Sequence, residues 1–110
     1  MAYKVSISEQ AEKDLNDIYS YIYYDLKSKI SADRISQRLR NAMVGLSEMP
    51  KRFHVCPLEP WFSRGVRSVP VGNYSVFYFV NDDENDFLVT RVVYGKRSME
   101  KLELYFFMQL

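Results

Sequence analysis

The first half of the chain combines one strand pattern with two helical patterns. From Tyr3 to Ile7, apolar residues occupy every second position, which is typical of a half-buried strand. Ser8 suits the start of a helix, because its hydroxyl accepts a hydrogen bond from a free first-turn amide. An apolar stripe then recurs every three or four residues to about Leu26, and a second stripe continues until Pro50 stops it. These patterns predict a strand followed by a helical hairpin.

The second half is dominated by strand patterns. Segments 65–69, 74–80 and 87–94 are rich in Val, Phe and Tyr, and the sequences PVGN and NDDEND between them have turn compositions. Segment 51–63 contains two prolines and has no consistent period, which predicts a loop. The order β-α-α-β-β-β predicts an α+β domain in which a helical hairpin packs on a small antiparallel sheet.

The end of the chain and the strand 74–80 both carry more apolar surface than one buried face requires. Residues 103–110, ELYFFMQL, form an apolar C-terminal tail where chains usually fray into solvent. In the strand 74–80, Phe77 and Phe79 lie on one face, and Val76 and Tyr78 lie on the other. We expect residues 104–110, or a helix of a partner, to cover Phe77 and Phe79.

Length and composition predict one cytoplasmic domain. The 110 residues, 47% of them hydrophobic and 26% charged, suit a single domain over 1–110 with one modest core. The start, MAYKVSISEQ, turns polar within a few residues, so we expect no secretion signal, and no apolar run reaches the roughly 18 residues that span a bilayer. One cysteine, Cys56, cannot form an internal disulfide, which fits a reducing compartment.

The net charge is only +1, but the charge is unevenly distributed. Residues 26–67 contain nine Lys and Arg residues against three acids. This basic middle is typical either of a solvated helix face or of a surface that meets phosphate or an acidic protein segment.

Catalytic and metal-binding patterns are weak. His54 and Cys56 lie two residues apart but lack a third group that would orient a base, and the acidic turn 82–86 fits no calcium-loop spacing. No glycine-rich phosphate loop, CxxC pair or HExxH motif occurs. We therefore expect neither a metal nor a cofactor.

The remaining candidates are cations in or just after the predicted strands. Arg67, Arg91, Lys96 and Arg97 are placed to form one patch on the sheet that binds phosphate oxygens. Tyr94 and Tyr105 are aromatic neighbours that suit stacking on bases.

Four segments, AEKDLNDIYSYI, LSEMP, VRSVPVGNYSVFYFV and RVVYGKRS, together resemble toxins of the RelE/ParE superfamily over about residues 3–102. The resemblance implies a toxin of a type II toxin-antitoxin system, which inhibits growth when released from a small, partly acidic antitoxin. It also implies a hetero-oligomer of toxin and antitoxin. RelE-like members cut messenger RNA on the ribosome, whereas ParE-like members act on DNA gyrase.

The nuclease residues of RelE-like toxins carry over poorly. Ser75 stands where they have an arginine after the strand's first tyrosine, and Glu103 stands where they have a late tyrosine, with Tyr105 the nearest candidate. Two strand lysines fall near Val66 and Ser68, and only Arg97 matches clearly.

The resemblance therefore favours a ParE-like protein that binds gyrase and is not an enzyme. One alternative is a ribosome-dependent mRNA endonuclease that uses Arg67, Arg97 and Tyr105. Another is a non-toxic relative that binds only its antitoxin or DNA. The candidate residues for binding a target or antitoxin are Arg64, Arg67, Arg91, Lys96, Arg97, Phe77 and Phe79.

Overall fold

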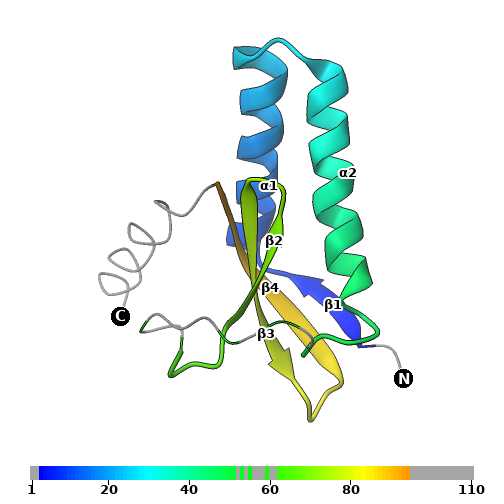
Figure 1. The fold of residues 1–110 in the computed structure, drawn as a ribbon, viewed down its shortest axis with the longest axis vertical. Coiled ribbons are helices and arrows are strands. Elements are labelled where there is room, and N and C mark those ends of the chain that lie inside the picture. Colours follow the sequence, from blue (N-terminus) through cyan, green and yellow to red (C-terminus); the bar gives the residue numbers. More distant parts are fainter. Residues whose placement is uncertain (1–2, 52, 54, 56–58, 60–61, 95–110) are drawn as a thin grey trace.

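The computed structural model describes residues 3–51, 53, 55, 59 and 62–94. Its elements follow the predicted order β-α-α-β-β-β (Figure 1). They are β1 (Lys4–Ile7), α1 (Glu9–Ser20), a π-helical turn η1 (Tyr21–Asp25), α2 (Lys29–Gly45), β2 (Arg67–Val71), β3 (Tyr74–Asn81) and β4 (Asp86–Tyr94). In this part of the chain, no helix is long and apolar enough to cross a membrane.

The four strands form one sheet in the order β1-β4-β3-β2. β2, β3 and β4 make the predicted antiparallel meander, but β1 pairs parallel with β4, so the sheet is mixed and the prediction of a wholly antiparallel sheet is wrong. The reason is the return path of the helices. The amide of Tyr3 donates to the carbonyl of Ser47 at 2.7 Å, which brings the end of the hairpin back to the start of β1. From there β2 runs in the same direction as β1, β3 runs back, and β4 runs parallel to β1 again.

The two helices lie side by side against one face of the sheet, and their tip projects beyond it (Figure 1). Between helices and sheet lies the core, in which Leu15, Leu39 and Met43 of the helices pack with Val76 and Tyr78 of β3. The alternation predicted for β3 is therefore confirmed, because Val76 and Tyr78 lie on the helix-facing side.

Both helix starts are capped by serine. The hydroxyl of Ser8 accepts from the amide of Ala11 at 3.0 Å, as predicted, and Ser28 does the same for Ser31 at 3.2 Å. The first helical run extends to Asp25, close to the predicted end at Leu26, but its last turn is π-helical.

The second helix ends at Gly45, before the predicted stop at Pro50. Met49, whose spacing continues the second apolar stripe, is 61% exposed. The early end has a tertiary cause, since the backbone and hydroxyl of Ser47 bind the backbone of Tyr3 in place of a further helical turn.

Strand β2 begins and ends two residues later than its pattern suggested and contains Pro70. Proline is acceptable there because β2 is the edge strand of the sheet.

A bulge changes the face of the last strand. Phe77 pairs with Arg91 and Tyr78 with Val89, which leaves Thr90 as an extra residue in β4. Beyond the bulge the alternation shifts, so that Val92 joins Val89 in the core instead of lying on the opposite face.

Candidate functional site

The described cations on the sheet do not gather into one patch. Arg67 is half-buried, and its guanidinium donates to the carbonyl of Phe53 at 2.6 Å and to that of Lys51 at 3.4 Å. It therefore holds the segment after α2 against the start of β2. This contact leaves Arg67 with a structural role at the edge of the sheet.

Arg91 turns toward helix α1. Its Nε donates to Asp14 Oδ2 at 2.8 Å and its Nη2 to Asp14 Oδ1 at 3.1 Å, while the backbone amide of Val92 donates to the same carboxylate at 3.0 Å. Asp14 is only 8% exposed. Its carboxylate thus ties α1 to the edge of β4 beyond the end of β1, and Arg91 serves as its counter-ion.

The other cationic candidates have different positions. Arg64 is exposed in the turn that precedes β2. Lys96, Arg97 and Tyr105 lie outside the described residues, as do His54, Cys56 and the apolar tail 103–110.

The sheet face opposite the helices is partly covered. Phe77 is fully buried and Val93 is nearly so, whereas Phe79 is 42% exposed and its cross-strand partner Leu88 is 38% exposed. The half of this face near Phe79 and Leu88 is therefore an exposed apolar surface. Cover of Phe77 and Phe79 by residues 104–110 or by a partner helix stays a prediction, because residues 104–110 lie outside the described residues.

The acidic turn between β3 and β4 is held by side-chain contacts. Asp82 accepts from Lys51 Nζ at 2.6 Å and from the Tyr3 hydroxyl at 3.1 Å. These two donors, Lys51 first, lower the pKa of Asp82 below its usual value. Asp82 thereby holds the turn between β3 and β4 against the start of β1 and the segment after α2.

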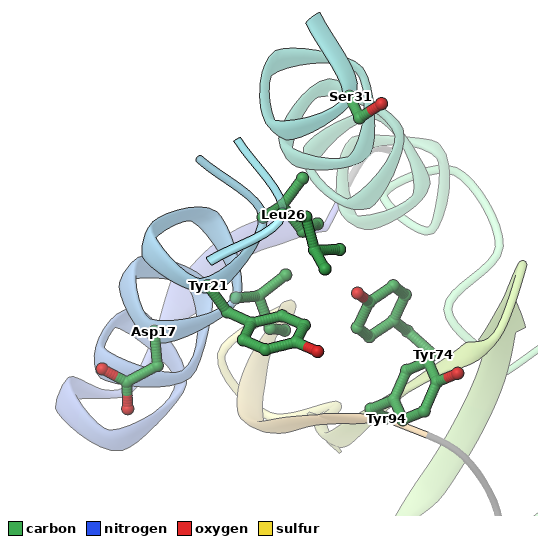
Figure 2. A pocket seen from close by; sticks show the side chains of 8 residues that line it. Asp17, Tyr21, Leu26, Ser31, Tyr74 and Tyr94 are labelled. Carbon is green, nitrogen blue, oxygen red and sulfur yellow. The ribbon is translucent and has the colours of Figure 1, made fainter. Parts of the chain in front are cut away.

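An open apolar groove of about 550 Å³ lies between the helical hairpin, the start of β3 and the end of β4. It is lined by Asp17, Ile18, Tyr21, Ile22, Leu26, Ser31, Tyr74 and Tyr94. Figure 2 shows Tyr21 and Leu26 pointing from the hairpin toward the rings of Tyr74 and Tyr94. Contiguous apolar surfaces on a soluble protein often mark binding sites, so this groove is the candidate functional site.

The π-helical turn shapes the groove. The amide of Leu26 donates to the carbonyl of Tyr21, five residues back, at 3.1 Å. In this wider turn, residues five apart lie one above the other, whereas an α-helix would rotate them to different sides. Tyr21 and Leu26 therefore both face the groove.

The tyrosines of the floor form a compact group. The rings of Tyr74 and Tyr94 meet edge to face, with centroids 5.3 Å apart. Partial burial raises the pKa of Tyr74 above its usual value, with smaller contributions from Tyr94 and Tyr21. The phenol of Tyr74 is consequently neutral at physiological pH and adds no charge to the groove.

The remaining tyrosines of the hairpin make a separate cluster at its tip. Tyr19 stacks on Tyr23 with centroids 5.9 Å apart and donates its hydroxyl to Asp33 at 2.7 Å. Lys29 donates to the same carboxylate at 2.9 Å. The hydrogen bonds from Tyr19 and then from Lys29 lower the pKa of Asp33 below its usual value. Because Tyr19 belongs to α1 and Asp33 to α2, this cluster links the two helices at the tip of the hairpin.

Comparison with known proteins assigns a family. A family model described as the ParE toxin of the type II toxin-antitoxin system, parDE, matches residues 5–99. The chain belongs to the ParE toxin family. No curated protein sequence matches this ParE family member significantly.

Solved structures share its fold. A chain of the chromosomal ParDE toxin-antitoxin system from P. aeruginosa has a TM-score of 0.69 and 19% identity, with 86% of this chain and 98% of that one covered. The RelBE2 complex from Mycobacterium tuberculosis gives 0.66 and 22%, covering 86% and 92%. A mutant of E. coli RelE in the free state gives 0.64 and 18%, covering 94% of each chain. The predicted RelE/ParE-like fold is confirmed.

The groove was not among the sequence candidates, although one signal pointed to it. Tyr19, Tyr21, Tyr23 and Tyr24 are too closely spaced to share one helix face. Some of them must therefore lie at the surface or at an interface, and Tyr21 is the one that lines the groove.

Proposed function

We propose that this ParE family member is a toxin that inhibits growth by binding DNA gyrase in the cytoplasm and is held inactive by a cognate antitoxin. The family match supports the toxin assignment. Antitoxin binding is supported by the neighbours in fold, which include toxin-antitoxin complexes from Mycobacterium tuberculosis and Pyrococcus horikoshii.

The observation that carries the choice of binding over RNA cleavage is the contact made by Arg67. An RNA-cutting site needs cations that face the scissile phosphate. Arg67 instead donates to two backbone carbonyls, and Arg91, the next described strand cation, binds Asp14. Ser75 offers a hydroxyl where a nuclease would have a cation.

Two assays test this proposal, one on the purified toxin and one on cells that express it. The toxin, released from its antitoxin, should inhibit supercoiling of relaxed plasmid by purified gyrase. Primer extension on transcripts from cells that express the toxin should show no new cleavage sites. Cut transcripts with normal supercoiling would show that the protein is an endonuclease, and normal growth on expression would identify a non-toxic relative.

We further propose that Arg64 and Arg97 contribute to target binding through their charge. Arg64→Ala and Arg97→Ala should each weaken gyrase inhibition, whereas Lys13→Ala, which removes an exposed cation from α1, should not. If all three variants inhibit equally, these two arginines do not contact the target.

A further inference from the structure

The helical hairpin separates its charges between its two helices. Helix α1 contains four acids and one cation, whereas α2 contains four cations and one acid. That acid, Asp33, is already paired with Lys29 at 2.9 Å and accepts a hydrogen bond from Tyr19. The remaining cations of α2 therefore give this helix a positive surface that its own acid does not offset.

The outward side of α2 is polar along its middle. Every exposed side chain between Ile30 and Val44 is polar. Four of them lie three or four residues apart and so share one side of the helix. We call these four exposed residues the α2 ridge: Arg34, Gln37, Arg38 and Asn41. The side-chain amide of Gln37 donates to that of Asn41 at 2.8 Å, which holds the two amides together on the ridge.

The two arginines of the ridge have no hydrogen bond or ion pair within the described part of the chain. Arg40, on another side of the same helix, instead pairs with Glu12 at 3.6 Å. The Nη1 atom of Arg38 lies 3.3 Å from where a Cβ on Gly72 would stand, so its guanidinium lies over the turn between β2 and β3. The charge of the ridge is therefore available to a partner, from the middle of α2 to that turn.

The composition of the ridge suits a phosphate backbone better than a protein surface. Phosphate oxygens are bound mainly by Arg and Lys, together with polar side chains such as Asn and Gln. Protein partners are bound by aromatic or aliphatic anchors at the centre of the contact, and the ridge has none. Duplex DNA carries one charge about every 1.7 Å along its axis. Because Arg34 and Arg38 are about 6 Å apart along the helix, each can meet a different phosphate.

We propose that the α2 ridge binds the phosphate backbone of the duplex DNA that gyrase holds, so that the toxin contacts enzyme and DNA together. This inference rests on the proposed function for the identity of the target. It adds a second contact made by Arg34 and Arg38, which does not depend on the DNA sequence.

The first test measures DNA binding by the purified full-length toxin without gyrase. The anisotropy of a fluorescein-labelled duplex of about 30 base pairs is followed between about 50 and 200 mM salt. Two duplexes of unrelated sequence should bind equally, and the logarithm of the binding constant should fall linearly with the logarithm of the salt concentration. Arg34→Gln/Arg38→Gln should weaken binding at least about tenfold and reduce this slope by about two, because two phosphate contacts are lost.

The matched control removes the same charge from the same helix. Lys29→Gln/Arg40→Gln replaces two cations that are already paired, so it should keep the salt slope of the wild type. Arg34→Lys/Arg38→Lys keeps the charge and should retain most of the binding. All variants should keep the midpoint of the circular dichroism melting curve, since the replaced side chains are exposed. Equal losses in the two Gln variants would overturn the inference, as would tighter binding of a single-stranded RNA of the same length.

The second test places the DNA on gyrase. Binding of the toxin to purified gyrase is measured by surface plasmon resonance with and without a bound duplex. The wild type should bind the gyrase-DNA complex about tenfold more tightly than gyrase alone, since the second contact becomes intramolecular. Arg34→Gln/Arg38→Gln should bind both forms equally.

The two proposals fail in different ways. If the wild type inhibits supercoiling but binds both forms of gyrase equally, the DNA contact is overturned while the target stands. If the toxin binds free duplex through the ridge but neither binds nor inhibits gyrase, the proposed target fails while the ridge remains a DNA-binding surface.

Discussion

The ion pair between Asp14 and Arg91 is less exposed than the other ion pairs of the described residues, so its loss should be costly for this fold. Asp14 is 8% exposed, and the side chain of Arg91 is 16% exposed. The carboxylate accepts from the Arg91 guanidinium at 2.8 and 3.1 Å, from the Val92 amide at 3.0 Å and from Gln10 at 3.2 Å. The carboxylate therefore neutralises the buried charge of Arg91. It also accepts from the backbone amide of Val92, which lies beyond the part of β4 that pairs with β1.

Replacing Asp14 with alanine removes the charge partner of Arg91 and leaves the Val92 amide unsatisfied. Breaking a buried pair from one side costs about 3 to 5 kcal/mol, and we expect about 3 kcal/mol because Arg91 keeps some access to water. Arg91→Met should cost about 2 kcal/mol, since the carboxylate retains the hydrogen bond from Val92. The double variant should cost about 1 to 2 kcal/mol less than the two single changes together.

Urea unfolding followed by circular dichroism measures these free energies, with each toxin variant separated from its antitoxin after co-expression. The matched control is Arg40→Met, because Arg40 of α2 and Glu12 of α1 form an exposed pair at 3.6 Å. This control should change the free energy of unfolding by less than about 0.5 kcal/mol.

Two results would refute the reasoning. If the costs of Asp14→Ala and Arg91→Met simply add in the double variant, the two groups do not stabilise each other. If Arg91→Met loses target or antitoxin binding at unchanged stability, Arg91 belongs to a binding surface, as the sequence suggested.

Three further substitutions test local features by the same unfolding measurement. Gly72→Ala should destabilise by about 1 kcal/mol or more, because Gly72 has a φ of 60° and an added Cβ would crowd the Arg38 guanidinium. Gly45→Ala, at an open helical position, should be neutral or stabilising by up to about 1 kcal/mol. Equal effects of the two substitutions would contradict the turn geometry at Gly72. Ser8→Ala should cost about 1 to 2 kcal/mol, since the hydroxyl caps α1 and also donates to a β4 carbonyl, and Ser8→Thr should retain most of the stability. Tyr78→Phe should cost about 1 to 2 kcal/mol because it strands the buried carbonyl of Pro50, bonded at 2.6 Å; an unchanged midpoint would mean that water replaces the hydroxyl.

Local patterns predicted much of the fold. The strand ending at Ile7, the cap at Ser8 and the helix-facing side of β3 all follow from spacing within a few residues, where sterics and hydrogen bonding are local. The second helix shows where this reasoning stops. Its apolar stripe continues past Gly45, but a contact between Ser47 and Tyr3, 44 residues apart, ends the helix first.

The candidate site depended more strongly on distant contacts. Strand periodicity cannot reveal the bulge at Thr90, which moves Val92 into the core. Nor does an arginine in a strand show whether it meets a partner or an acid of its own chain, and Arg91 bonds to an acid 77 residues away. The patch expected from Arg67 and Arg91 therefore was not found among the described residues.

The sequence by itself determined the order of the elements, the helix starts and the apolar faces, because periodicity records which side of each segment avoids water. Only the tertiary structure decided what lies opposite those faces. It placed β1 parallel to β4 and brought Tyr21 of the hairpin to Tyr94 of the sheet, which opened an apolar groove beside Arg34 and Arg38. Such neighbours are set by how the chain returns on itself, and no pattern within one segment contains that information.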